Sequence, residues 1–418
     1  MSLSNLRLRS GTVGFLIAIA LSSMLASSVL AGSPGELDVT FSNDGKRFID
    51  FGRVEGALHV SVDPAGRLTV AGYHGRFDPV RDAIARLLPN GSLDREFGRD
   101  GRVIFDPPND HGVVDWSSAP DGSLIGLGWR GGDRYYLVKF GSDGSIDEGF
   151  GNAGIATGRF AGGIHDDMIV IPSGRILVLG TVDGNTVIKA HRLDGSRSMA
   201  FGEDGVARIN GESSRLVPDP VGRFFVTGVR GNRRFVVDAF LANGSRDASF
   251  GRSGRGHVDI DVVAGEELEF PEGTIDSSGD LILAGDVLQD LSTADLILAK
   301  LDADGRADAT FGGGDAWRRM DIGPLDFPSA VTARPDGRFV IAGMVLQDLF
   351  GHHHADMFLL GLKADGSRWT AFGDNGVIQT DFGFHGDVIA AGALMSGGKL
   401  VVAGEAKGNF FVARYKLN

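Results

Sequence analysis

The stretch Gly91-Ser92-Leu93-Asp94-Arg95-Glu96-Phe97-Gly98-Arg99-Asp100-Gly101 decides the fold, because the chain repeats its Phe-Gly core. The same pair begins at further positions, which are Phe150, Phe201, Phe250, Phe311 and Phe372. An additional copy, Phe41-Ser42, has serine in place of the glycine. Successive phenylalanines are 49 to 61 residues apart, the drift expected from loops of different length around one fixed unit. The sequence is therefore a seven-fold repeat.

A pair of glycines six positions apart marks the same register in every repeat. The pairs are Gly66/Gly72, Gly122/Gly128, Gly174/Gly180, Gly222/Gly228, Gly279/Gly285, Gly337/Gly343 and Gly398/Gly404. The first glycine follows turn formers, as in Asp121-Gly122, and accepts the positive φ that a two-residue hairpin demands. The second ends a hydrophobic strand, where a bend or a close backbone approach is expected.

Each repeat also contains four short hydrophobic runs bounded by turn residues, which predict strands. In the second repeat these runs are 101–106, 113–119, 123–129 and 134–140. The chain has no cysteine and 64 glycines, and after residue 31 it shows no sustained helical periodicity. Seven such units predict an all-β fold, a seven-bladed β-propeller of four-stranded antiparallel blades. The alternative is an open solenoid, which would need capping units.

The two ends of the chain complete one another. Arg414-Tyr415-Lys416-Leu417-Asn418 matches Arg86-Leu87-Leu88-Pro89-Asn90, and Gly35-Glu36-Leu37-Asp38 matches the Gly91-Ser92-Leu93-Asp94 that follows. The last repeat thus lacks its ending, and the N-terminus supplies it. We expect residues 46–51 to pair as the outer strand of the blade made by residues 387–417, which would remove exposed sheet edges.

The Phe-Gly motif also predicts how the repeats contact one another. The phenylalanine is expected to fill the gap between adjacent blades. In five repeats an aspartate lies three residues before it, and we expect this side chain to accept backbone N–H groups of its own turn. These residues are Asp38, Asp94, Asp147, Asp247 and Asp308. Ser198 and Trp369 replace the aspartate in the remaining two repeats.

The N-terminus has the pattern of a secretory signal peptide. Arg7 and Arg9 precede an uncharged apolar run over residues 12–26, and Val29-Leu30-Ala31 fits the small-x-small cleavage pattern. We expect residues 1–31 to be removed and residues 32–418 to form a single domain, secreted or periplasmic and not inserted in a membrane. The alternative is an uncleaved anchor, but the run is short of the roughly 20 residues that a spanning helix needs.

The charge of the chain excludes some classes of partner. The formal net charge is −13 at pH 7, and removal of the two signal arginines would make it more negative. A chain this acidic is not expected to bind nucleic acid or anionic lipid. We expect a monomer.

The motif set resembles that of the delta-60 repeat family of bacterial exported proteins. The matching stretches are residues 91–101 and Pro335-Asp336-Gly337-Arg338-Phe339-Val340-Ile341-Ala342-Gly343. Ser42 and the irregular turn Gly312-Gly313-Gly314-Asp315 depart from the pattern. The resemblance extends from Gly35 onward. It implies an exported, propeller-like bacterial protein and supplies no catalytic residue.

Candidate ligand-binding residues lie where the chain enters the innermost strands, since propellers bind ligands around the mouth of the central channel. These residues are His59, His111, His165, Asp166, Asp167, His385 and Asp387. Four histidines at related places could converge on a metal or an anionic ligand. The alternative is that these polar side chains fill solvated loops, with a structural role for Asp167 and Asp387.

Two other stretches contain residue types that bind metals, but neither has the pattern of a known metal site. His352-His353-His354 lies in a loop that lacks the fixed tetrahedral geometry of a zinc site. The spacing in Asp302-Ala303-Asp304-Gly305-Arg306-Ala307-Asp308 is wrong for an EF-hand, and the same stretch in other repeats is a turn. We expect no metal and no cofactor.

The sequence contains no nucleophile elbow, zinc-protease motif, phosphate-binding loop or cysteine nucleophile. The leading hypothesis is a binding or scaffold propeller that serves a protein, glycan or cell-surface partner. The alternative is a hydrolase or lyase acting at the channel mouth, with His111, His165 and His385 as ligands or bases. A third hypothesis is a calcium-stabilised surface protein.

Overall fold

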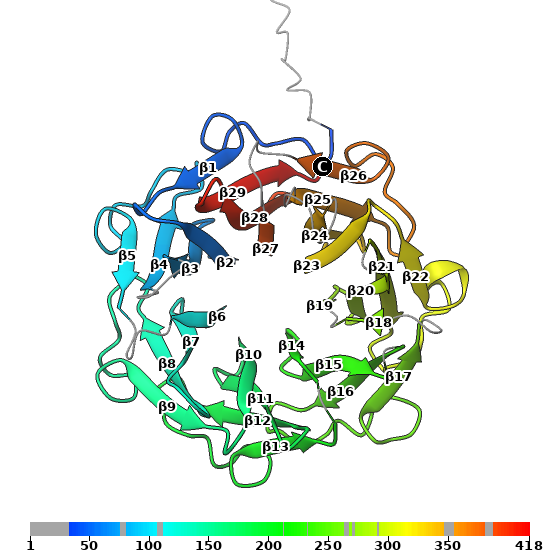
Figure 1. The fold of residues 1–418 in the computed structure, drawn as a ribbon, viewed down its shortest axis with the longest axis horizontal. Coiled ribbons are helices and arrows are strands. Elements are labelled where there is room, and N and C mark those ends of the chain that lie inside the picture. Colours follow the sequence, from blue (N-terminus) through cyan, green and yellow to red (C-terminus); the bar gives the residue numbers. More distant parts are fainter. Residues whose placement is uncertain are drawn as a thin grey trace, which may run out of the picture. The chain divides into compact units, whose positions relative to one another are not determined.

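The innermost strands of the repeats stand around a common centre, and the later strands of each repeat lie farther out (Figure 1). The computed structural model describes residues 33–418 apart from 76–80, 107–111, 212, 232, 263–266, 270–271, 291, 347–354 and 381–387. Residues Gly32–Asn418 form one compact unit, to which the description refers. Within the described residues, no helix has the length and hydropathy required to cross a membrane.

The described residues form five four-stranded antiparallel blades. From the centre outward, their strands are β2 (Glu55–Val62), β3 (Leu68–His74), β4 (Arg81–Leu87) and β5 (Arg102–Phe105); β6 (Val113–Ser118), β7 (Leu124–Trp129), β8 (Arg134–Phe140) and β9 (Ile155–Arg159); β10 (Ile164–Val170), β11 (Ile176–Val182), β12 (Asn185–His191) and β13 (Val206–Ile209); β14 (Arg215–Pro218), β15 (Phe224–Arg230), β16 (Arg234–Phe240) and β17 (His257–Asp261); and β27 (Val388–Met395), β28 (Lys399–Ala406), β29 (Asn409–Lys416) and β1 (Lys46–Ile49). The outermost strand of each blade follows a Phe-Gly motif or, for β1, Phe41-Ser42.

The prediction of seven separate blades is wrong, because the strands of two repeats merge into one nine-stranded sheet within the described residues. Its strands are β18 (Glu267–Leu268), β19 (Glu272–Ile275), β20 (Leu281–Asp290), β21 (Thr293–Leu301), β22 (Trp317–Met320), β23 (Leu325–Ala333), β24 (Phe339–Leu346), β25 (Ala355–Leu362) and β26 (Val377–Thr380). A short 3-10 helix, η2 (Phe311–Gly313), precedes β22.

A single parallel pairing, Ala294 with Leu325, merges the two repeats. The Ala294 N–H donates to the Pro324 carbonyl at 3.0 Å and supports this pairing. The strands β20 and β21 have 10 and 9 residues, and their length carries Ala294 to the first residue of β23. We call this contact between β21 and β23 the seam.

The predicted closure by the N-terminal strand is confirmed. The strand β1 pairs antiparallel with β29, with Lys46 opposite Ala413. Nearer the N-terminus, Leu37 forms a bridge with Tyr415. The beginning and the end of the described chain therefore belong to the same blade (Figure 1).

The four strands predicted for the second repeat are confirmed to within one residue as β5, β6, β7 and β8. The first of them belongs to the blade of the preceding repeat, so each of these blades draws its strands from two repeats. This sharing is the same arrangement that lets β1 complete the last blade.

Each motif phenylalanine is buried in a hydrophobic cluster that joins two neighbouring repeats. Phe97, for example, packs with Ile84 of its own repeat and with Tyr136 of the next. Such burial stabilises the fold by roughly 1.5–3 kcal/mol per side chain. The turn glycine of the next repeat lies against the ring, and a Cβ on Gly144 would stand 2.9 Å from Phe97. The predicted role of the phenylalanine is confirmed.

The amide that follows each motif phenylalanine links neighbouring repeats. It donates to a turn carbonyl of the next repeat at 2.7 to 3.1 Å. We call each of these bonds a junction. The junctions are Ser42 to Asn90, Gly98 to Asp143, Gly151 to Asp194, Gly202 to Asn243, Gly251 to Asp304, Gly312 to Asp365 and Gly373 to Pro34. The last of them ties the final repeat to the beginning of the described chain.

The aspartate that precedes the motif phenylalanine in five repeats has two roles. Its Oδ1 accepts the predicted turn N–H, as from Glu96 to Asp94 at 3.2 Å, and this cap is confirmed in all five repeats that have the aspartate. Its Oδ2 pairs with a basic side chain, as with Arg86 Nε at 2.7 Å.

Basic side chains also donate to backbone carbonyls of the next repeat, and we call these residues clamps. The clamps among the described residues are Arg86 to Ser142, Lys139 to Leu193, Arg175 to Ala242, Arg223 to Ala303, Arg334 to Leu417 and Arg414 to Pro89. Junctions and clamps together hold each repeat to its neighbour through the backbone, which explains why the motif recurs with so little change.

Candidate functional site

One side chain per repeat occupies an equivalent position on the innermost strands. Each lies opposite the residue before the second glycine of its repeat, as His59 lies opposite Ala71. We call these residues the inner ring, and its members are His59, Asp115, Asp167, Arg215, Glu272, Ala330 and Ala391. In most repeats a β-bulge directly precedes the position, and a bulge re-aims the side chain that follows it. The first five members are ionisable and the last two are alanine.

Asp115 and Asp167 form a hydrogen-bonded carboxyl pair. Each also accepts a backbone N–H from the inner strand of the next repeat. Met168 donates to Asp115 Oδ2 at 2.7 Å, and Leu216 donates to Asp167 Oδ2 at 2.5 Å. These N–H groups belong to the innermost strands, whose inner edges carry no further strand, so the carboxyls satisfy them.

Burial changes the protonation of this pair. Both carboxyls are half-buried, and the poor solvation of the charged form raises the pKa of Asp115 to about 6. Burial and the neighbouring charge of Asp115 raise the pKa of Asp167 well above its ordinary value. The pair therefore keeps a shared proton to a higher pH than an ordinary carboxyl would.

Arg215 and Glu272 form the next part of the inner ring. Arg215 Nε lies 2.9 Å from Glu272 Oε1, and the side chains are 38% and 28% exposed. The positive charge of Arg215 also acts on both Asp115 and Asp167, where it partly opposes the effect of burial. The four residues thus form one electrostatically connected group on four neighbouring strands.

His59 is the member of the inner ring that precedes Asp115. Its side chain bonds to a residue of the second repeat, to which Asp115 also belongs. Its Nε2 is 3.2 Å from Ser118 Oγ. Burial lowers the pKa of His59 to about 4, so the imidazole is neutral at physiological pH. The polar arc of the ring therefore presents a neutral imidazole, a proton-sharing carboxyl pair and an ion pair.

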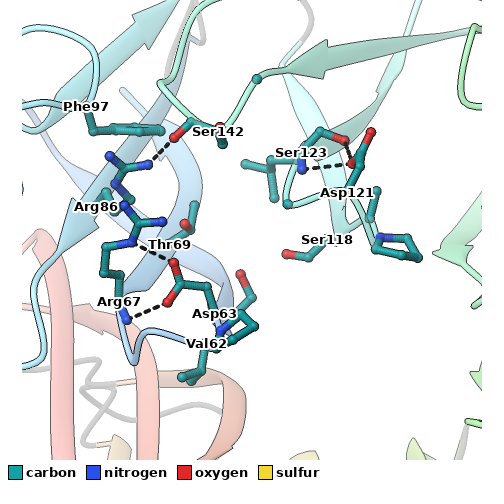
Figure 2. Close-up of a pocket in the computed structure, with 17 residues that line it drawn as sticks. Val62, Asp63, Arg67, Thr69, Arg86, Phe97, Ser118, Asp121, Ser123 and Ser142 are labelled. Carbon is teal, nitrogen blue, oxygen red and sulfur yellow. Dashed lines mark hydrogen bonds and ion pairs between the residues drawn. The ribbon is translucent and has the colours of Figure 1, made fainter.

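A crevice of about 560 Å³ lies between the hairpin turns of the first two repeats (Figure 2). Arg67 and Arg86 lie on one side of it and Asp121 on the other (Figure 2). These charges already serve the frame, because Arg67 pairs with Asp63 at 2.6 Å, Arg86 is a clamp and Asp121 pairs with Lys139 at 3.3 Å. We therefore place the candidate site on the inner ring, where the repeats differ in chemistry.

The structure brings two of the predicted site residues into the inner ring, His59 and Asp167. His165 and Asp166 lie on β10 directly before Asp167, and their side chains are outside the described part of the structure. The remaining predicted residues lie outside the described residues, and they are His111, His385 and Asp387. The histidines at 352–354 also fall outside them. Convergence of the histidines stays a prediction.

The turn at Asp302 is an ordinary turn, as the comparison of repeats indicates. Asp302 Oδ1 accepts the N–H groups of Asp304 at 3.0 Å and Arg306 at 2.8 Å. This carboxylate caps its own loop in the manner of an Asx turn.

Sequence reasoning missed Asp115, Arg215 and Glu272. Each is the one ionisable residue of its short inner strand, with no motif around it. A signal was nevertheless present, since every member of the inner ring lies thirteen residues before the second glycine of its repeat, as His59 does before Gly72. Alignment of the repeats on that glycine would have placed the ring.

Comparison with known proteins agrees with the fold. A family model described as "Domain of unknown function (DUF5122) beta-propeller" matches residues 64–97 and 119–150. These segments contain the glycine pairs and the Phe-Gly motifs of the first two repeats. Together with the arrangement of the blades, the match identifies the chain as a β-propeller repeat protein. No curated protein sequence matches the chain significantly.

Solved structures show the same fold at low sequence identity. A catalytically inactive virginiamycin B lyase from Staphylococcus aureus, solved with quinupristin, has a TM-score of 0.53 and 10% identity, covering 89% of this chain and 99% of its own. The WD40 repeats of RRP9 have a TM-score of 0.51 and 10% identity, covering 92% of this chain and 99% of their own. These likenesses concern the fold alone.

Proposed function

We propose that the protein is an exported, bacterial member of the delta-60 repeat family that binds a neutral, hydroxyl-rich ligand, such as a cell-surface glycan, at the inner ring. The observation that carries the proposal is the polar arc itself. Five successive inner strands place ionisable side chains at one register position, and the last two carry alanine there. Partly buried ionisable groups are costly, so their gathering at one place supports a binding role.

The chemistry of the arc favours hydroxyl groups over strongly charged ligands. His59 is neutral and Arg215 is paired with Glu272. The Asp115–Asp167 pair offers both a donated proton and acceptor oxygens, the combination that recognises a hydroxyl. A strongly anionic ligand would face these carboxyls, and a strongly cationic ligand would compete with Arg215.

The N-terminal pattern of Arg7, Arg9 and the apolar run after them supports export, and an exported protein meets surface glycans. Export also makes the absence of cysteine informative, since the fold then depends on junctions, clamps and burial where other exported proteins use disulfides.

The test is a screen of the purified protein against a panel of envelope glycans, followed by titration calorimetry on any ligand found. The double variant Arg215→Met/Glu272→Gln should weaken binding at least tenfold. A matched control is Arg67→Met/Asp63→Asn in the crevice, an ion pair whose side chains are 37% and 29% exposed. Unchanged binding by the ring variant, or a selective loss in the crevice variant, contradicts the proposed site.

A hydrolase or lyase is the second candidate, and one observation favours it. Burial raises the pKa of both carboxyls of the Asp115–Asp167 pair, and a carboxyl with a raised pKa can serve as a general acid. In that case the bound ligand would be cleaved, and the rate would fall as pH rises and the pair loses its proton. Mass spectrometry of the ligand after long incubation decides between the two, because a binding protein returns it intact.

A further inference from the structure

Three aspartates gather at the seam that merges two repeats into the nine-stranded sheet. Asp295 is on β21, Asp326 is on β23, and Asp321 follows the end of β22. One carboxylate oxygen of each lies within 4.8 Å of the others. Asp295 and Asp326 are the direct neighbours of Ala294 and Leu325, whose pairing makes the seam. The cluster thus sits where two of the described repeats merge into one sheet.

Asp326 points to a ligand independently of the clustering. Its side chain is fully buried, and its Oδ2 accepts the Ile322 N–H at 2.7 Å. Its Oδ1 is also buried and accepts no hydrogen bond of good geometry from any described residue. A buried carboxylate oxygen without a partner destabilises an ordinary core, because the solvation it loses is not replaced. The two neighbouring carboxylates add repulsion, and a cation would remove both penalties.

Equivalent positions in some other repeats carry the opposite charge. The residue aligned with Asp295 is Arg81 in the first repeat and Arg234 in the fourth, each two residues before the partner of the second glycine on the adjoining strand, whereas the sixth repeat has Asp356 there. Arg81 pairs with Asp106 at 2.5 Å, and Arg234 pairs with Asp261. At the seam the same geometry brings Asp295 toward Asp321, so a stabilising pair is replaced by two like charges.

The closing blade supplies the closest internal match to the seam. There Glu55 accepts the Phe51 N–H at 3.2 Å, as Asp326 accepts that of Ile322, and Asp50 occupies the place of Asp321. The residue aligned with Asp295 is Asn409, which is neutral. In the closing blade two carboxylates, Asp50 and Glu55, therefore meet at this loop, and the seam adds a third at the place that Asn409 holds there.

Nearby cations balance only part of the charge. Arg319 Nε lies 2.5 Å from Asp295 Oδ2, and the Gln289 amide donates to the same oxygen at 2.9 Å. Among the described residues one arginine faces three carboxylates, so these side chains together keep a net negative charge when all are ionised. Asp321 is exposed, which leaves the cluster open to solvent on its side.

We propose that Asp295, Asp321 and Asp326 bind a divalent cation, with calcium preferred, that ties the two merged repeats together. The ligands are all carboxylate oxygens, which suit hard cations rather than zinc or copper. Two oxygens about 2.4 Å from one calcium ion can be no more than about 4.8 Å apart, and the three carboxylate oxygens lie within this limit. Magnesium demands a near-ideal octahedral shell and retains several of its waters, so a cage of protein carboxylates favours calcium.

The test uses the chelator-treated full chain with calcium or magnesium alone, followed by titration calorimetry and thermal unfolding. Calcium should bind with one site per chain and raise Tm by a few degrees at saturation. Asp321→Asn, an exposed position that should fold normally, should weaken calcium binding at least tenfold. Asp304→Asn, in the exposed turn after Asp302, is the control and should bind calcium as the unaltered protein does.

A second variant builds the site where it is missing. Asn409→Asp adds a third carboxylate beside Asp50 and Glu55 in the closing blade, and it should create a second, weaker calcium site. No calcium binding by the unaltered protein, or binding that Asp321→Asn leaves unchanged, overturns the proposal. An equal affinity for magnesium overturns the preference for calcium.

Discussion

Each repeat contributes one junction and one residue of the inner ring, yet the two features differ in how much their residues vary between repeats. Every junction has the same donor, the same kind of acceptor and nearly the same length. The inner ring, by contrast, changes from histidine to aspartate, arginine, glutamate and alanine around the same fold. Residues that hold neighbours together through the backbone repeat, because each neighbour presents the same groups. Residues that face the centre are free to vary, and variation there can serve a ligand.

The largest effect at a constant pH is expected where a clamp closes the chain. Arg414 bonds to Asp38 at 2.8 Å, to Thr40 at 2.8 Å and to the Pro89 carbonyl, and Asp38 is only 2% exposed. Arg414→Met should lower the free energy of unfolding by about 3 kcal/mol, since it leaves a buried carboxylate with fewer partners. Denaturant unfolding measures the change.

The internal clamp Arg86 is the comparison for Arg414. Arg86→Met should cost a similar amount if the closing contact is as tight as an internal one. Arg192→Met, at an exposed arginine, should change stability by less than about 0.5 kcal/mol. A much smaller loss for Arg414→Met than for Arg86→Met would show that the closing contact is weak.

The pH dependence of stability should have opposite signs for carboxyls that cap inner strands and for carboxyls in ion pairs of the frame. Asp82 accepts the Val113 N–H of the next repeat at 2.8 Å, and burial raises its pKa to about 7. The folded state then holds the proton more tightly than the unfolded state, so stability falls as pH rises from about 4 to 7. Asp82→Asn should remove this dependence, and the wild type should lose up to about 4 kcal/mol relative to the variant across that range.

The control for this pH dependence is Asp63. Against the effect of burial, hydrogen bonds from Arg67 lower the pKa of Asp63. Its stabilising contribution is present above the unfolded pKa and lost as pH falls, so Asp63→Asn should be less stable than wild type at neutral pH. Unfolding curves between pH 3 and pH 8, in about 1-unit steps, give both signs. If Asp82→Asn and Asp63→Asn changed the pH dependence of stability in the same direction, the opposite pKa shifts of Asp82 and Asp63 would be contradicted.

A junction glycine should tolerate no side chain. Gly202 has φ +55°, and a Cβ there would stand 2.1 Å from the Val206 carbonyl oxygen. Gly202→Ala should cost about 1–3 kcal/mol. Gly397→Ala, at φ +77° with open space around the Cβ position, separates strain from collision and should cost about 1 kcal/mol. Equal losses would mean that the junction is not tightly packed.

The smallest effect is expected at the one junction without glycine. Ser42 holds φ at +54° although it has a side chain. Ser42→Gly should relieve this strain and raise stability by about 0.5–1 kcal/mol, visible as a small rise in Tm. A loss of stability would show that the serine side chain makes a useful contact.

The frame could be predicted because its determinants recur along the sequence. Phe97 and its counterparts appear once per repeat, so spacing alone locates the junctions, the strands and the closing strand. The merger of two repeats could not be predicted in this way, because it depends on the single pair Ala294 and Leu325. That pair forms only after β20 and β21 extend beyond the length of their counterparts.

The candidate site was predictable only in part. His59 and Asp167 stood out as polar residues before inner strands, whereas Arg215 and Glu272 become neighbours only when adjacent repeats stand side by side. The acidic cluster at the seam could not be predicted for the same reason, because its members come from two strands and a loop and become neighbours only in the folded chain. Chemistry shared between repeats leaves no motif in the sequence of one repeat.

Hydrogen exchange at the seven junction amides tests most directly the claim that one repeated bond holds every repeat to its neighbour. The account predicts comparable protection for all seven, with Gly373, which closes the chain onto Pro34, as slow as Gly151 in the interior of the sequence. Fast exchange confined to Gly373 and Ser42 would contradict it, because it would show that the chain stands open where its two ends meet.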